Sequence, residues 1–381
     1  MKYPIIIIGS GLSGYQLARE FRKLDTKTPL HIITADTGDF YPKPQISNAF
    51  AKKHTPETLI NHSADIMATQ LNATVTTQSV VTKIDPVNKI IFCQDKFFPF
   101  SKLVLAWGAQ AIKPPIMGTA AEDILSINHL HDYVHFRKQI VDKKRIAILG
   151  AGLIGCEFSN DLIHAGFDVH VIAPAKAPLD LLIPESIGKL LQNALEKCGI
   201  HFHLNCLAHR VDKSDNQFIL TLSNSEILET DLILSAIGLI PRIELAKEAH
   251  LRVNRGIVVN RFLQTSHPDI YALGDCAEVD GHVLPFITPI LQTSRALALT
   301  LSGKETAVHY PAMPITVKTP AFPLVICPPP KNCQGDWNIT IQNNSVRALF
   351  YDETKQLRGF ILANEFISER AQWTKEIPAL I

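Results

Sequence analysis

The 381 residues, with 37 lysines and arginines against 36 aspartates and glutamates and a net charge of +1, suffice for more than one domain. This charge balance gives no global case for binding nucleic acid or a membrane surface. No apolar run approaches the roughly 18 residues of a spanning helix, and the isoleucine run at 5–8 is too short for a signal-peptide core. We therefore expect a cytoplasmic protein without a membrane span.

The N-terminal segment predicts a βαβ unit built around a glycine-rich turn. Residues 5–8 are typical of a buried parallel strand, 13–24 of a helix and 30–34 of a second strand. Between the first strand and the helix lies the segment Gly9-Ser10-Gly11-Leu12-Ser13-Gly14. Its glycines allow a tight turn, close approach of a pyrophosphate, and close packing of helix and strand. Asp36 follows the second strand, where an acid can accept hydrogen bonds from a ribose.

The next hundred residues lead to a predicted domain crossing. Residues 38–60 are polar and rich in proline, as in a long loop that covers a ligand. Residues 75–84 and 89–98 alternate like two antiparallel strands joined by a turn. A buried strand is expected at 103–109, and the segment Lys113-Pro114-Pro115 marks the crossing.

The same layout then restarts about 140 residues later, with a second fingerprint. The segment Gly150-Ala151-Gly152-Leu153-Ile154-Gly155 follows a strand at 145–149 and opens a helix at 154–165. A strand is predicted at 168–172 and a helix at 186–198. Further strands are expected at 201–204, 218–222 and 232–238, the last ending in Gly238. Two fingerprints at strand-to-helix junctions indicate that the chain holds two dinucleotides, which suggests electron transfer between them.

The remaining chain completes the first domain and adds a third. Residues 270–275 form a short strand that ends in Gly-Asp, and 291–301 a helix. We assign 1–110 and 239–308 to one dinucleotide-binding domain, 111–238 to another, and 309–381 to a small α+β C-terminal domain with a closing helix. The fold class is therefore α/β with two Rossmann-like domains.

These segments resemble the flavoprotein reductases that bind two dinucleotides, and within them the bacterial rubredoxin reductases. The likeness rests on both fingerprints and on the segments 33–36, 105–109, 152–158, 270–275 and 316–321. It covers essentially the whole chain and implies FAD, NADH and the one-electron iron carrier rubredoxin as partner. The flavin would carry the redox chemistry, so no catalytic side chain is expected.

The resemblance also implies the residues that contact each cofactor. For FAD these are Gly9, Ser10, Gly11, Leu12, Ser13, Gly14, Asp36, Lys43, Val81, Glu157, Asp275, Ile287 and Lys318. For the nicotinamide nucleotide they are Gly150, Gly152, Leu153, Ile154, Gly155 and Gly238. Glu157 is expected where nicotinamide meets flavin. Taken alone, Lys43 and Lys318 would be interpreted as solvated surface lysines.

The positions of the cysteines indicate whether a thiol takes part in electron transfer. Related disulfide reductases carry a cysteine pair early in the chain, and peroxidase and oxidase relatives a single cysteine after the second strand. Here the first of seven scattered cysteines is Cys93, in the predicted hairpin. No pair is spaced like a redox motif or a disulfide framework. Electrons are therefore expected to pass from flavin directly to the carrier.

Three questions stay open at the sequence level. The segment 171–176 carries no acid for the ribose of NAD and no arginine for NADP, so NADH is preferred on the resemblance alone. The pairs His129/His131 and His201/His203 lack further ligands in the sequence pattern, so no metal site is expected. The acceptor could be a ferredoxin, or the chain could be a flavin-binding redox sensor without a carrier.

Overall fold

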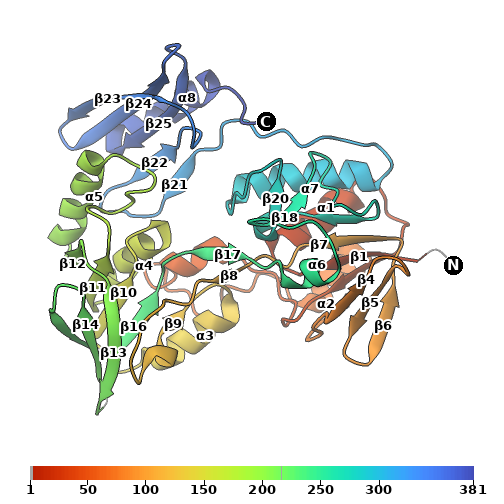
Figure 1. Ribbon diagram of the computed structural model, residues 1–381, viewed down its shortest axis with the longest axis horizontal. Coiled ribbons are helices and arrows are strands. Elements are labelled where there is room, and N and C mark those ends of the chain that lie inside the picture. The colour runs from red at the N-terminus through yellow and green to blue at the C-terminus, as the bar shows by residue number, and fades with distance from the viewer. Residues whose placement is uncertain (1–2, 216) are drawn as a thin grey trace.

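The computed structural model describes residues 3–215 and 217–381, which form three sheet-centred parts (Figure 1). The first part is a five-stranded parallel sheet in the order β19-β7-β1-β2-β3. Its strands are β19 (Ile270–Ala272), β7 (Lys102–Leu105), β1 (Ile5–Ile8), β2 (Leu30–Ile33) and β3 (Thr74–Thr76). All four isoleucines of β1 are buried, as expected of a central strand covered on both faces.

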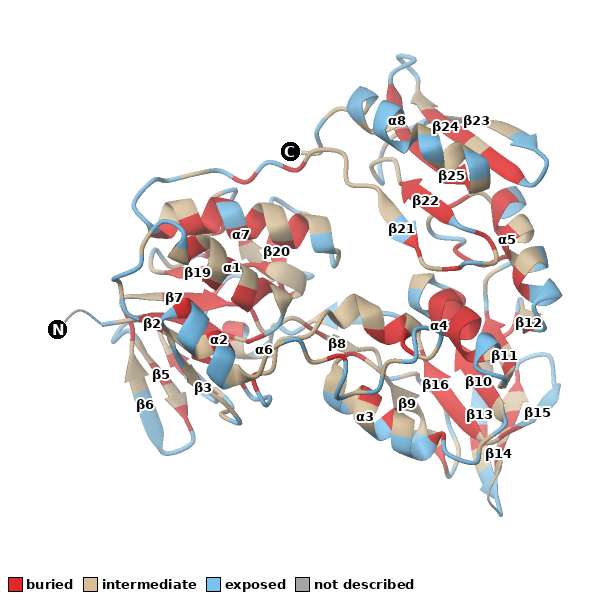
Figure 2. Cartoon of the chain, turned by 180° about the vertical axis from the view of Figure 1, so that it is seen from behind, coloured by how far each residue is buried: buried red, intermediate tan, exposed pale blue. Residues whose placement is uncertain are grey.

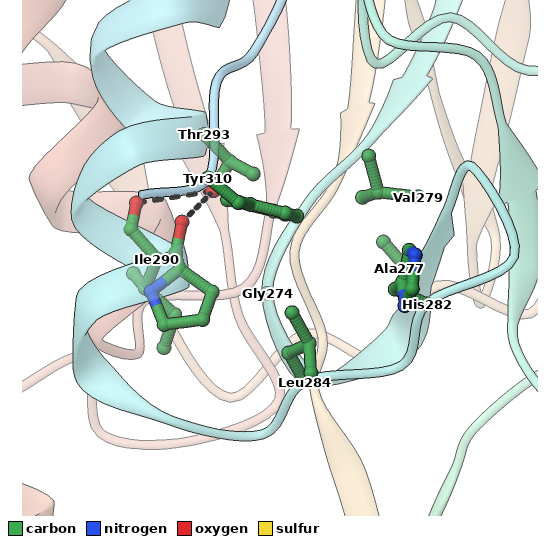
Figure 3. A pocket seen from close by; sticks show the side chains of 9 residues that line it. Gly274, Ala277, Val279, His282, Leu284, Ile290, Thr293 and Tyr310 are labelled. Atoms are coloured by element: carbon green, nitrogen blue, oxygen red, sulfur yellow. Dashed lines mark hydrogen bonds between the residues drawn. The ribbon is translucent and has the colours of Figure 1, made fainter. Parts of the chain in front are cut away.

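Helices and smaller sheets cover this first sheet. Helices α1 (Leu12–Arg22) and α7 (Ile287–Leu301) pack against each other, and α2 (Ala64–Leu71) contacts β3. An antiparallel sheet of β4 (Lys83–Asp85), β5 (Ile90–Cys93) and β6 (Lys96–Pro99) and the pair β18 (Ile257–Val259) and β20 (Ala277–Val279) complete the lobe. A small cavity lies beside α7, and the Tyr310 ring forms part of its lining (Figure 3). The Thr293 hydroxyl, which also lines it, donates to the carbonyls of Pro289 and Ile290 at 2.9 and 3.1 Å.

The second part repeats the design in the strand order β12-β11-β10-β16-β9. The strands are β12 (His201–Leu204), β11 (Asp168–Ala173), β10 (Arg145–Leu149), β16 (Leu232–Ser235) and β9 (Leu125–Ser126). The helices are α3 (Leu130–Gln139), α4 (Leu153–His164) and α5 (Glu185–Lys197). An antiparallel meander of β13 (Ala208–Ser214), β14 (Gln217–Leu222) and β15 (Ile227–Thr230) packs on one sheet face through a separate apolar cluster.

The third part is an antiparallel sheet in the order β21-β22-β25-β24-β23. Its elements are β21 (Ile315–Val317), β22 (Leu324–Cys327), β25 (Leu357–Ala363), β24 (Ser345–Asp352), β23 (Gly335–Gln342) and the closing helix α8 (Arg370–Glu376). One face shares its apolar core with the second part, and buried residues continue between them (Figure 2). The chain end returns to the first part, where Leu380 N–H donates to Tyr310 O at 2.7 Å.

Two short strands mark the passage between the first two parts. Outgoing β8 (Ala109–Ala111) and returning β17 (Leu239–Pro241) pair in antiparallel fashion between the lobes (Figure 1). The expected crossing at 113–115 therefore begins a few residues earlier, as one half of a two-stranded ribbon. The short helix α6 (Glu244–Glu248) follows the return.

Several sequence-based bounds were wrong. The expected strand at 75–84 is two strands, because the chain leaves the parallel sheet at Gln78, whose φ is +49°, before β4 begins. Helix α7 begins at Ile287 rather than 291. Pro289 lies in its first turn, where the backbone N–H groups have no acceptor within the helix, so a proline is tolerated there. Strands β7 and β16 end before Gly108 and Gly238, which lie in the following turns. The meander strands β13 and β15 were not anticipated.

Among the described residues, no helix combines the length and apolar character needed to cross a membrane.

Candidate functional site

The first glycine segment is shaped by three different contacts. Gly9 has a φ of +115°, and a Cβ there would lie 2.4 Å from Ala106 O. A Cβ on Gly14 would lie 2.0 Å from Gly9 O, so helix α1 can approach β1 only with glycine at this place. At Gly11 a Cβ would have no neighbour within 4 Å. The backbone at the start of α1 therefore faces open space, as an anion-binding helix N-terminus requires.

The second segment reproduces this geometry. Gly150 has a φ of +106°, and a Cβ on Gly155 would lie 2.0 Å from Gly150 O. At Gly152, the N-cap of α4, a Cβ would again have no neighbour within 4 Å. Leu153 and Ile154 form the first turn of α4, and the Ile154 side chain is exposed. Both fingerprints thus leave a free backbone surface in front of a helix N-terminus.

A charged pair unites two predicted residues that are far apart in sequence. Lys43 Nζ lies 3.9 Å from Asp275 Oδ2 and donates to Asn128 Oδ1 at 2.8 Å. Burial lowers the pKa of the Lys43 ammonium, an effect that Asp275 opposes. Burial likewise raises the pKa of the Asp275 carboxyl against the pull of Lys43. The Asp275 side chain is 16% exposed and that of Lys43 39%, so the carboxylate is the more shielded of the two charges.

A second charged cluster joins the other two parts of the chain. The Glu157 side chain is 5% exposed and lies 2.7 Å from Lys318 Nζ, measured at Oε2. Ser47 Oγ donates to the same oxygen at 2.6 Å, and the backbone N–H of Lys318 donates to Oε1 at 3.1 Å. The Lys318 ammonium also donates to Ser47 Oγ at 2.7 Å and to the carbonyl of Pro44. Glu157 therefore holds the loop after β2 and the C-terminal sheet against α4.

The remaining predicted residues lie on other elements of the first lobe and beside the ribbon between the lobes. Asp36 is exposed just beyond the end of β2. Ile287 is the first residue of α7, and Val81 packs half-buried on the core of the first lobe. Gly238, with a φ of +123°, accepts a hydrogen bond from Ile112 N at 3.0 Å beside the ribbon between the lobes. Within the described part of the chain, no hydrogen bond or ion pair joins the side chains of Asp36, Val81 or Ile287 to the two charged clusters.

Sequence reasoning missed Ser47 and Asn128, the hydrogen-bonding partners of Lys318 and Lys43. A serine in an irregular loop and an asparagine before a helix carry no signal of their own. It also missed Asp161, whose carboxylate accepts from the backbone N–H groups of Phe50 and Ala51 at 3.0 and 2.8 Å. The available clue was the position of Asp161 on the predicted helix, one turn after Glu157 and therefore on the same helix face.

The cysteines nearest these sites are unsuited to redox exchange. Cys156 and Cys276 are fully buried, and burial raises the pKa of each thiol to about 12. Cys93 is buried in β5, away from the loop after β2. All seven cysteines are free thiols. The geometry thus offers two dinucleotide cradles with lysine and carboxylate groups between them and without a thiol relay.

Two family models match consecutive regions of the chain. Residues 3–298 match the family model described as pyridine nucleotide-disulphide oxidoreductase, and residues 307–377 match the rubredoxin binding C-terminal domain. The chain is 45% identical to the rubredoxin-NAD(+) reductase of Alcanivorax borkumensis, with 100% of both chains covered. It is also 45% identical to the enzyme of that name from Acinetobacter baylyi, with 100% of this chain and 99% of the relative covered. A crystal structure of NADH:rubredoxin oxidoreductase from Clostridium acetobutylicum shares the fold, with a TM-score of 0.82, 21% identity, and coverage of 99% and 95%.

Proposed function

The chain belongs to the pyridine nucleotide-disulphide oxidoreductase family, and we propose that it is an FAD-dependent reductase that passes electrons from NADH to rubredoxin in the cytoplasm. The observation that carries this proposal is the full-length likeness at 45% identity to two rubredoxin-NAD(+) reductases. The match of residues 307–377 to a rubredoxin-binding domain supports the acceptor. The cytoplasm is where a reductase of this kind meets the NADH pool.

We assign FAD to the first cradle. The open backbone at Gly11 and the start of α1 would hold the pyrophosphate, with Asp36 at the ribose. Lys43 and Asp275 would flank the flavin, and Val81 and the first turn of α7 at Ile287 would complete its surroundings. When bound, FAD supplies hydride acceptance and the release of electrons one at a time.

The protein's own groups have electrostatic and positioning tasks. The Lys43 ammonium, 3.9 Å from Asp275, would offer a positive charge to an electron-rich ring beside it. Glu157 neutralises Lys318 and fixes its ammonium against the loop at 44–47. We propose that the Lys43 ammonium stabilises the negative charge that reduction brings, while the Glu157–Lys318 pair holds the loop at 44–47 in place.

NADH is assigned to the second cradle at Gly150–Gly155, with Gly238 near the passage between the lobes. The open space at Gly152 would admit the pyrophosphate at the N-terminus of α4. Beyond β11, Pro174 and Ala175 lead to the exposed Lys176, so no acid stands there for the ribose hydroxyls. The preference for NADH over NADPH therefore rests on the relatives.

An anaerobic titration tests the whole scheme. NADH should bleach the yellow protein, and oxidised rubredoxin should then restore the flavin colour. NADPH in place of NADH tests the donor, and a ferredoxin in place of rubredoxin tests the acceptor. Equal slow rates with both carriers would contradict rubredoxin as the substrate. Reoxidation no faster with any carrier than with air would favour a redox sensor, and folded protein without flavin absorbance would refute the proposal.

A further inference from the structure

A cluster of histidines and carboxylates lies on the second lobe, away from both cradles. Asp168 and His170 lie in the first half of β11, and His201 and His203 lie on the edge strand β12, with His170 paired to His201. Because side chains alternate along strands, all four share one face of the sheet. Asp168, His170 and His201 lie in the amino-terminal halves of their strands, whereas Gly150 follows the carboxyl end of β10.

Three of these side chains converge on one point. Asp168 Oδ1 lies 3.4 Å from His170 Nε2 and 3.6 Å from His201 Nε2. One ligand atom from each residue lies within 4.8 Å of the others. Tetrahedral Zn²⁺ with ligand bonds of about 2.0–2.2 Å needs separations of about 3.4 Å, which small side-chain rotations reach. Two imidazoles and a carboxylate are a donor set that suits Zn²⁺ and its neighbours in the first transition row.

A hydrogen-bonded chain behind this point orients the central imidazole. His170 Nδ1 lies 3.0 Å from His203 Nε2, and His203 Nδ1 lies 3.1 Å from Glu226 Oε1. The carboxylate of Glu226 can only accept, so a neutral His203 donates its Nδ1–H to it and accepts the Nδ1–H of His170. His170 Nε2 is then left with a lone pair that faces the Asp168 carboxylate. A cation between them satisfies both groups.

The surroundings fit reversible binding from solution. The His170 side chain is only 16% exposed, so the hydrogen bond that orients its ring is shielded from bulk water. The side chains of His201 and Asp168 are 60% and 36% exposed, which leaves an open side for entry and for a water ligand. The outer partners match the hydrogen-bonded shell that normally fixes metal-ligating histidines.

We propose that Asp168, His170 and His201 bind one Zn²⁺ or similar divalent transition-metal ion, with His203 and Glu226 as the groups that orient His170. Such an ion would link the edge strand β12 to β11. Glu226, which directly precedes β15, links the meander to the same site through His203. The site is independent of the flavin and nicotinamide cradles. The sequence pattern alone did not reveal it, because the chain separates its members into three segments.

Calorimetric titration of the metal-free, FAD-loaded protein with ZnCl₂ at pH 7.5 tests the site. We expect one ion per chain, at least tenfold weaker binding in His201→Ala and Asp168→Asn, and about 10- to 100-fold weaker binding in His203→Gln. His209→Ala removes an exposed histidine of β13 in the same lobe and should bind Zn²⁺ like the unaltered protein. Zn²⁺ should also raise the melting temperature of the unaltered protein and of His209→Ala, but not that of His201→Ala.

The outcomes separate this site from the redox proposal. Equal affinity in all four variants and the unaltered protein, or no binding at micromolar Zn²⁺, would overturn the metal site. Substituting the largely exposed His201 should leave the fold intact, which flavin content and circular dichroism verify. If the unaltered protein binds Zn²⁺ but does not reduce rubredoxin with NADH, this result counts against the proposed function and leaves the metal site standing.

Discussion

Replacing Lys318 with methionine tests how the C-terminal sheet is held against the second lobe. The Lys318 ammonium lies 2.7 Å from both the Glu157 carboxylate and the Ser47 hydroxyl. Methionine keeps the apolar stem and removes the charge. The Glu157 carboxylate, 5% exposed, would then retain only the Ser47 hydroxyl and one backbone N–H as donors.

The expected loss of stability follows from this geometry. At 2.7 Å and an effective dielectric constant of 20, the gross attraction is about 6 kcal/mol. The cost of removing both charges from water offsets most of it, and the Lys318 side chain is still 28% exposed, so solvent screens the pair. We expect the free energy of unfolding to fall by about 2 kcal/mol in Lys318→Met. Adding Glu157→Gln should recover at least half of this loss, because a neutral amide needs no counter-charge.

Urea unfolding followed by tryptophan fluorescence measures the effect. Two of the three tryptophans, Trp337 and Trp373, lie in the C-terminal part and report on the sheet that Lys318 anchors. Lys331→Met, an exposed lysine of the same part, is the matched control and should change the free energy of unfolding by less than about 0.5 kcal/mol. The reasoning is refuted if Lys318→Met behaves like this control, or if the double variant shows only the sum of the two single losses.

Three further predictions concern the cradles, the pH dependence and the thiols. Gly14→Ala should prevent stable folding because its Cβ would meet a backbone oxygen at 2.0 Å, whereas Gly11→Ala should fold but retain less FAD, as flavin absorbance per chain will show. Burial raises the pKa of Asp275 above its unfolded value, so folding disfavours its ionised form. As pH rises from about 3.9 toward neutrality, Asp275→Asn should therefore gain stability relative to the unaltered protein, and it should also lose FAD affinity. If the melting temperature of the variant differs from that of the unaltered protein by the same amount at pH 3 and at pH 7, this reasoning is contradicted. Iodoacetamide should label the exposed Cys198 and not the buried Cys156, without slowing rubredoxin reduction, and inactivation in step with labelling would reinstate a thiol in the mechanism.

Local pattern was sufficient where one short segment determines its own structure. The strand at 145–149 has the expected bounds because its apolar run is buried on both faces and ends at a fingerprint glycine. The two cradles follow for the same reason, since Gly14 and Gly155 lie against backbone oxygens only five residues earlier. The strand expected at 75–84 failed because its alternation continues through Gln78, where a left-handed residue redirects the chain.

Long-range pairs were beyond that reasoning. Lys43 and Asp275 meet because the loop after β2 and the turn after β19 both leave the carboxyl edge of the first sheet, and α4 holds that loop in place. Glu157 and Lys318 meet because the C-terminal sheet packs on the second lobe. Family resemblance supplied each of these residues, but only the fold reveals which lysine pairs with which acid.

The loop after β2 departs from its own lobe and is held by the second part of the chain. Ile46 and Ala49 belong to the apolar core of the second and third parts, and Asp161 of α4 holds the backbone at residues 50 and 51. Ser47 is held by Glu157, so the 3-10 turn Lys43–Asn48 moves with α4 rather than with the first sheet. Lys43 nevertheless reaches back across the passage to Asp275. Helix α4, whose N-terminus we assign to the nicotinamide nucleotide, therefore also sets the position of Lys43, which we assign to the flavin site, so a shift of α4 on nicotinamide binding would change the charge presented to the flavin.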